Sequence, residues 1–141
     1  MKFDPAWEFI NNSEIIKEQF DDLPDFHDAF VEKLAFNTGN CNDGGVIPPS
    51  VIVVLDLPIR KRNGTSYEFL YYIHLKLELS GVVKASLSDF TYDNCIYFMN
   101  ISRLDDSDLL IVKVDSSTNA DSFECEVTCT SVTVQSCEKK E

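Results

Sequence analysis

The stretch YEFLYYIHLKLEL, residues 67–79, decides the fold class of this chain of 141 residues. Apolar or aromatic residues stand at every second position, and polar residues such as His74 and Lys76 fill most positions between them. The alternating set is Tyr67, Phe69, Tyr71, Ile73, Leu75, Leu77 and Leu79, and only Leu70 and Tyr72 interrupt the polar face. Successive side chains of a strand point to opposite faces, whereas a helix repeats every 3.6 residues. The stretch is therefore predicted to be a β-strand with one face in the core.

The preceding residues predict the partner of this strand. Residues 50–57 are β-branched and apolar on both faces, which is typical of a central strand covered on two sides. Residues 60–64 form a polar loop that ends in Asn63-Gly64, a dipeptide typical of tight hairpins. We therefore predict an antiparallel hairpin between residues 50–57 and 67–79.

Shorter apolar runs separated by turn-forming residues predict the rest of the sheet. These further strands are residues 27–36, 82–87, 95–103, 109–115 and 123–130. Residues 37–49 are dense in turn formers, so we expect them to be the least structured segment of the chain. After Thr130 the apolar positions slip by one, to Val132 and Val134. A bulge near Ser131 and a new strand after a short break both account for the slip, and the sequence leaves both open.

The first 25 residues are predicted to be helical. Asp4-Pro5 and Ser13 are good helix starts, and Pro24 disfavours helical geometry at the residue before it. The residues expected to pack this segment are Trp7, Ile10, Ile16 and Phe20. The predicted fold class is α+β, a single domain over residues 1–141. An N-terminal helical segment (1–25) packs on a large, curved, mainly antiparallel β-sheet of six or seven strands (26–137).

The charge distribution indicates which classes of macromolecule this protein can bind. Twelve basic and 24 acidic residues give a net charge of −12. The excess acid lies in residues 1–36 and 104–141, around a neutral centre. Such a field repels phosphates, so nucleic acid is not an expected ligand, whereas a basic protein would be attracted. Solubility alone is the alternative explanation of this charge.

The sequence also predicts the compartment. No apolar run approaches the roughly 20 residues that a membrane span needs, and no secretion signal is visible, so a cytoplasmic protein is expected. Five cysteines fit that compartment as reduced thiols. Cys125 and Cys129 lie four residues apart on a predicted strand, about 13 Å from each other, too far for one metal ion.

No group of residues predicts catalysis, so we expect a protein that is not an enzyme and has no cofactor or metal. Of the two histidines, His74 is expected on the surface, and His27 beside Asp28 is expected to be structural. No nucleophile elbow or phosphate-binding glycine loop accompanies them. The run Asp105-Asp106-Ser107-Asp108 lacks the glycine and glutamate of an EF-hand loop and is expected to be an acidic hairpin tip.

The run Phe26-His27-Asp28-Ala29 resembles the opening of the immunity protein 50 family, small bacterial proteins of polymorphic toxin systems. The similarity extends in order over nearly the whole chain, although residues 37–47 and the cysteine-rich tail fall outside it. The other residues that carry it are Trp7, Ser13, Phe20, Pro24, Pro49-Ser50, Gly81-Val82, Asn94, Phe123 and Cys125. The resemblance implies a protein that binds a cognate toxin and blocks it.

The expected partner is therefore a toxin protein, for example a basic nuclease domain, and neither nucleic acid nor a membrane. Self-association is left open. The candidate contact residues are two acidic clusters at element ends: Asp21, Asp22 and Asp25, and Asp105, Asp106 and Asp108. The alternative from another class is a binding module that holds an apolar or sugar ligand in the concave face of the sheet. That alternative requires the tyrosines to line an open pocket. They are Tyr67, Tyr71, Tyr72, Tyr92 and Tyr97.

Overall fold

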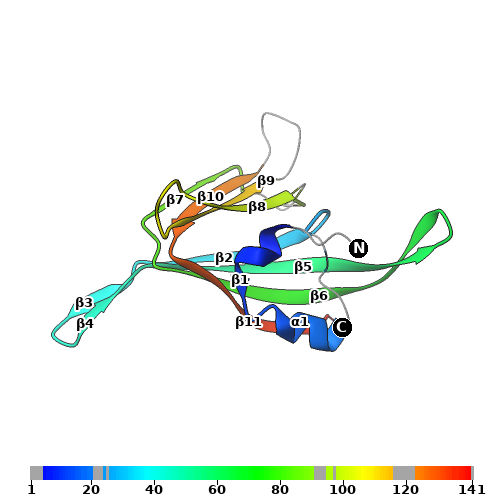
Figure 1. The fold of residues 1–141 in the computed structure, drawn as a ribbon, viewed down its shortest axis with the longest axis horizontal. Coiled ribbons are helices and arrows are strands. Elements are labelled where there is room, and N and C mark those ends of the chain that lie inside the picture. The colour runs from blue at the N-terminus through cyan, green and yellow to red at the C-terminus, as the bar shows by residue number, and fades with distance from the viewer. Residues whose placement is uncertain are drawn as a thin grey trace.

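The computed structural model describes residues 5–20, 24, 26–90, 95–96, 98–115 and 123–140, and its strands form two main sheets and one separate hairpin (Figure 1). The five-stranded sheet has the order β1 (Ile10–Asn11), β11 (Ser131–Lys139), β6 (Ser66–Ser80), β5 (Ser50–Asn63), β2 (Phe30–Asn37). The four-stranded sheet has the order β7 (Lys84–Ser88), β10 (Glu124–Cys129), β9 (Leu110–Asp115), β8 (Phe98–Arg103). The separate hairpin is β3 (Asn40–Asn42) with β4 (Gly45–Ile47). All neighbouring strands pair antiparallel except β1 and β11, which pair parallel.

The core lies between the two sheets. In β6 the alternating residues predicted to face the core are buried from Ile73 to Leu79. The same buried cluster includes Val112 of β9 and Val127 of β10. One cluster of buried apolar side chains joins both sheets with η1 (Pro5–Phe9) and α1 (Glu14–Phe20). Figure 1 shows the four-stranded sheet over one face of β2, β5 and β6. The apolar face of each sheet is thus covered by the other.

Two strands bend from one sheet into the other at the same corner. Gly81, which follows β6, has φ of +65°, and Thr130 is the single residue between β10 and β11. The Thr130 amide donates to the Ser80 carbonyl at 2.9 Å, and the Val83 amide donates to the Thr128 carbonyl at 2.9 Å. The paired strands therefore stay hydrogen-bonded through the bend, as at the corner of an orthogonal β-packing.

This corner explains the slip in apolar phase after Thr130. The chain breaks its strand at Thr130 and begins a new one at Ser131 in the other sheet. Cys129 and Val132 are both buried in the shared core, on either side of the break. Of the two alternatives, the new strand after a short break is the one that the structure has.

Several predictions about the elements need correction. The expected single sheet is wrong, because the strands divide into two sheets at the Gly81–Thr130 corner. The mainly antiparallel β-fold is confirmed, but α1 has only seven residues and η1 five, so α+β fits loosely. The predicted loop 60–64 belongs to β5 as far as Asn63, which pairs with Ser66 across the hairpin. The predicted turn segment 37–49 contains the β3–β4 hairpin.

The described part of the chain contains no helix that is long and apolar enough to cross a membrane.

Candidate functional site

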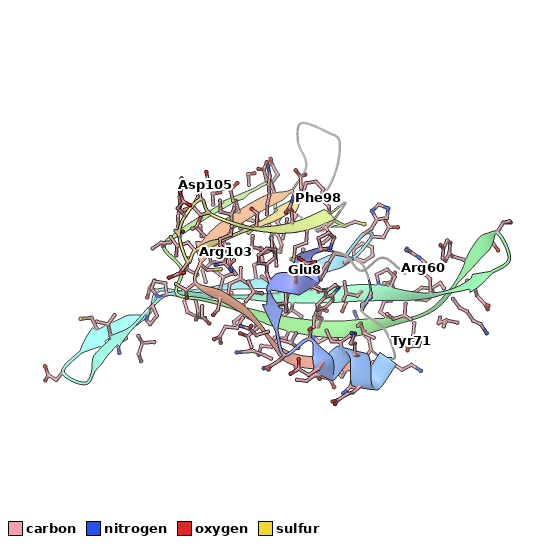
Figure 2. All side chains as sticks on the ribbon, in the orientation of Figure 1. Glu8, Arg60, Tyr71, Phe98, Arg103 and Asp105 are labelled. Carbon is pink, nitrogen blue, oxygen red and sulfur yellow. The ribbon has the colours of Figure 1, made fainter. Side chains whose placement is uncertain are left out.

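The structure places one of the two predicted acidic clusters. Asp105, Asp106 and Asp108 lie in the loop between β8 and β9, and all three are exposed. Figure 2 shows Asp105 at the end of the four-stranded sheet that is nearer to the β3–β4 hairpin. The other cluster, Asp21, Asp22 and Asp25, lies outside the described residues. The structure therefore supplies geometry for the β8–β9 loop alone.

The β8–β9 loop is held by its own hydrogen bonds. The Leu104 amide donates to the Leu109 carbonyl at 2.8 Å, and the Ser107 amide donates to the Leu104 carbonyl at 3.1 Å. The Ser107 hydroxyl accepts from the Leu109 amide at 3.0 Å. Asp106 adopts a positive φ of 53°, which aspartate tolerates better than most residues. The three carboxylates consequently project from a defined turn.

His27 and Asp28 lie in a turn before β2, not on a strand, so the predicted strand over residues 27–36 begins three residues late, at Phe30. His27 Nε2 lies 3.6 Å from Asp28 Oδ1, and Asp28 Oδ2 accepts from the Arg60 guanidinium at 3.0 Å. The Asp28 amide donates to the Ile96 carbonyl. The turn thus brings the two side chains together, whereas on a strand successive side chains point to opposite faces.

A second cluster unites residues that are far apart in the sequence: Glu32, Asp56, His74 and Lys140. Asp56 and His74 are direct cross-strand neighbours on β5 and β6, and Asp56 Oδ1 lies 3.0 Å from His74 Nδ1. Their positions alternate with core residues, so both side chains face away from the four-stranded sheet. Asp56 is 6% exposed, and it is the one charged residue among those described that is buried.

Glu32 reaches this cluster through an irregularity in β2. The ladder with β5 shifts between Val31 and Lys33, which leaves Glu32 as the extra residue. Bulges of this kind redirect a side chain. Here Glu32 Oε2 lies 3.3 Å from His74 Nδ1, so the imidazole nitrogen has a carboxylate oxygen from each of two strands beside it.

Lys140 completes the cluster after β11. Its backbone amide donates to the Tyr72 carbonyl at 2.9 Å, and its Nζ lies 2.6 Å from Asp56 Oδ2 and 3.7 Å from Glu32 Oε2. Burial by itself raises the pKa of Asp56, but the hydrogen bonds from Lys140 and His74 outweigh it and hold that pKa below its ordinary value. The hydrogen bond to Asp56 raises the pKa of Lys140. Asp56 is therefore an anion at neutral pH.

Sequence reasoning missed this cluster. Spacing gives no signal, because residues 32, 56, 74 and 140 meet only through strand pairing. One signal was available in residues 50–57, where Asp56 is a lone acid in an apolar strand. A charged residue in such a strand needs partners to compensate for its burial. His74, predicted to be an ordinary surface residue, is one of those partners.

Two hairpins extend beyond the sheets and expose apolar side chains (Figure 1). On β4, Val46 and Ile47 are 72% and 62% exposed. At the other end, β2 pairs with β5 only as far as Asp56, and β11 pairs with β6 only as far as Ile73. The loop end of the β5–β6 hairpin therefore has no neighbouring strand among the described residues. The exposed apolar residues of that end are Tyr67, Phe69 and Leu70.

No protein-family model, curated protein or solved structure matches this chain. The similarity to toxin-immunity proteins stays a prediction from the residues given above.

Proposed function

We propose that this protein binds another protein and neutralises it, as the immunity protein of a bacterial toxin. The observation that supports binding best is the β3–β4 hairpin, which belongs to neither main sheet and exposes Val46 and Ile47. Exposed apolar side chains on a projecting element are typical of protein contact sites. A lone two-stranded hairpin is marginally stable in water, so contact with a partner would also stabilise it.

The charge of the chain indicates a basic partner. The net charge is −12, and the β8–β9 loop presents Asp105, Asp106 and Asp108 on a hydrogen-bonded turn. This loop and the β3–β4 hairpin lie toward the same end of the long axis (Figures 1 and 2). The hairpin itself adds the acidic residue Asp43 and no basic one. One basic partner surface would therefore meet an apolar contact and complementary charge at this end.

The identification of that partner as a toxin comes from the resemblance described above, which begins at Phe26-His27-Asp28-Ala29. A basic nuclease domain is the partner that this charge fits best, because an acidic inhibitor would occupy the surface that nucleic acid uses. The protein would act in the cytoplasm, where such a nuclease does its damage.

A ligand-binding module is less well supported. Tyr67 would have to line a concave face, but it lies on the projecting end of the β5–β6 hairpin and is 67% exposed. Tyr71 packs partly against the core, and its ring lies under Lys139 Nζ at 4.6 Å. Tyr72 contacts Phe69, with ring centroids 4.9 Å apart. Tyr92 and Tyr97 lie outside the described residues.

The proposal predicts that a gene next to the one for this chain encodes a toxin-like protein, and that protein is the partner for the test. Purified toxin domain is assayed for activity with and without this protein, and association is followed by stopped flow at two salt concentrations. Asp105→Lys and Asp108→Lys, combined with Asp106→Asn because asparagine tolerates the positive φ at that position, should slow association and flatten its salt dependence without changing the melting temperature. Replacement of Val46 and Ile47 by serine should mainly speed dissociation, because it removes apolar contact.

A matched control is the pair Tyr67→Ser and Phe69→Ser on the opposite hairpin, which should leave both rates unchanged. Absence of binding and neutralisation by the natural protein would overturn the proposed function. If the natural protein binds the toxin and only the Tyr67→Ser and Phe69→Ser variants lose binding, the proposed function would stand. The contact surface would then lie on the β5–β6 hairpin.

A further inference from the structure

Glu32, Asp56 and His74 have the chemistry and the placement of a metal-binding site. One ligand atom from each residue lies within 4.8 Å of the other two, and His74 Nδ1 lies 3.0 Å and 3.3 Å from the two nearest carboxylate oxygens. Ligands about 2.0–2.2 Å from a zinc ion are roughly 3.3–3.6 Å apart when the geometry is tetrahedral. The 3.3 Å between Glu32 Oε2 and His74 Nδ1 falls in that range, and the 3.0 Å between Asp56 Oδ1 and His74 Nδ1 is slightly shorter.

Paired strands hold the three side chains in place. Asp56 and His74 face each other across the β5–β6 ladder, and the register shift in β2 puts Glu32 beside them. All three come from neighbouring strands of one sheet, not from loops, so an ion would need little rearrangement of the backbone. Asp56 is also buried, so little of its carboxylate is exposed to water.

The charge balance also favours a cation. Glu32 and Asp56 bring two negative charges, and Lys140 brings one positive charge. The two carboxylates therefore outnumber the one lysine. Glu138 on β11 is the other cross-strand neighbour of His74 and adds to the negative potential. Lys140 Nζ shows where a cation is attracted, and its side chain, 44% exposed, can move outward.

We propose that Glu32, Asp56 and His74 bind a divalent first-row transition-metal ion such as Zn²⁺. An imidazole nitrogen with two carboxylates suits zinc, cobalt and nickel, whereas magnesium and calcium prefer oxygen ligands alone. The three protein ligands leave a coordination position for water or a partner side chain. This site is independent of the proposed inhibitor function.

The position of Lys140 distinguishes a metal site from a simple ion-pair network. Lys140 interacts with the same two carboxylates that would ligate the ion, so its positive charge opposes metal binding. Lys140→Met should therefore tighten binding of Zn²⁺. If the cluster served only as ion pairs, the same change would lower stability and affect no ligand.

The test uses the full chain, freed of metal with a chelator and kept reduced, with Zn²⁺, Co²⁺ and Mg²⁺ as probes. Calorimetry should give one saturable site for Zn²⁺ and none for Mg²⁺, and Zn²⁺ should raise the melting temperature. Glu32→Gln and His74→Ala should each weaken Zn²⁺ binding by more than about tenfold. Loss of a residue that only hydrogen-bonds to a metal ligand already lowers metal affinity by about that factor. Glu32 is 46% exposed, so Glu32→Gln is expected to fold normally.

The matched control is His27→Ala, which removes a histidine beside one carboxylate, Asp28, and should leave the affinity unchanged. Cysteine ligation is distinguished by the Co²⁺ spectrum, because thiolate ligands give intense charge-transfer bands that N and O ligands lack. The proposal is overturned if Zn²⁺ shows no saturable binding. It is also overturned if binding persists in Glu32→Gln and His74→Ala, or if the bound Co²⁺ has thiolate bands.

Discussion

At the scale of single residues, Asp56 shows how a charge is accommodated in an apolar strand. Its neighbours in β5 are Leu55 and Leu57, both buried in the core. An isolated carboxylate at 6% exposure would be costly, but His74 and Lys140 both lie within hydrogen-bonding distance of it. The stability of this region should therefore depend on the ionisation of Asp56.

We expect Asp56→Asn to lower stability at neutral pH and to have less effect in acid. The folded-state pKa of Asp56 lies below the unfolded-state value, so its contribution is present above roughly pH 4 and is lost as the pH falls through the folded-state value. Urea unfolding of both proteins between pH 7 and pH 2 measures the difference. A difference that stays constant over this range would contradict the assigned role.

Because β6 has one buried face and one outer face, substitutions at neighbouring residues should lower the stability by very different amounts. Leu77 is fully buried between the sheets, so Leu77→Ala should cost about 2–5 kcal/mol. Lys76 lies on the other face, and Lys76→Ala should cost less than about 1 kcal/mol. Chemical denaturation measures both. Equal effects would mean that the face assignment is wrong.

At the scale of elements, the corner at Gly81 and Thr130 decides how two long antiparallel strands divide between two sheets. Gly81 has a positive φ, and a Cβ at that position would lie 2.2 Å from Thr130 Oγ1. The same Oγ1 donates to the Ser80 carbonyl at 3.0 Å. A side chain at Gly81 would thus strain the backbone and displace the threonine that closes the bend.

Gly81→Ala should therefore be more destabilising than Gly64→Ala. Gly64 has a similar φ of +67° but open space around it, so alanine there should cost only the backbone strain, about 1–2 kcal/mol. Gly81→Ala should cost at least about 1 kcal/mol more, because the Thr130 hydrogen bond is lost as well. Thermal and urea unfolding of the two variants give the comparison. Equal costs would show that the corner tolerates a side chain.

At the scale of the whole molecule, one core serves both sheets and contains three of the five cysteines. Burial raises the pKa of each thiol, Cys125, Cys129 and Cys137, to about 11. The thiolate is the reactive form, so these groups should be inert in the folded protein. Cys41 is exposed on β3.

We expect a thiol reagent to modify Cys41 first in the native protein and the three buried cysteines only after unfolding. Mass spectrometry of the labelled peptides, with and without denaturant, measures this order. Metal-free protein should melt at the same temperature with and without reductant, because the described cysteines are free thiols. A large effect of reductant would indicate a structural disulfide.

Patterns along one strand were predictable from the sequence, because side chains alternate whatever lies beside the strand. Strict alternation over residues 67–79 and the Asn63-Gly64 turn were enough to predict β6 and its pairing with β5. The buried face was predicted from Tyr67 to Leu79 but holds only from Ile73 to Leu79, because Tyr67 and Phe69 lie on the projecting hairpin end and are exposed. The exposed aspartates of the β8–β9 loop were likewise predictable from their run in the sequence.

Relations between strands were decided by tertiary structure alone. The division into two sheets depends on a close approach of Gly81 to Thr130, which lie 49 positions apart in the sequence. The cluster of Glu32, Asp56, His74 and Lys140 depends on strand register and on a one-residue shift in β2. A shift of one residue moves a side chain to the other face, and no local pattern specifies which strand lies opposite. The same pairing that buries Leu55 and Leu75 in the core therefore also brings Asp56 to His74.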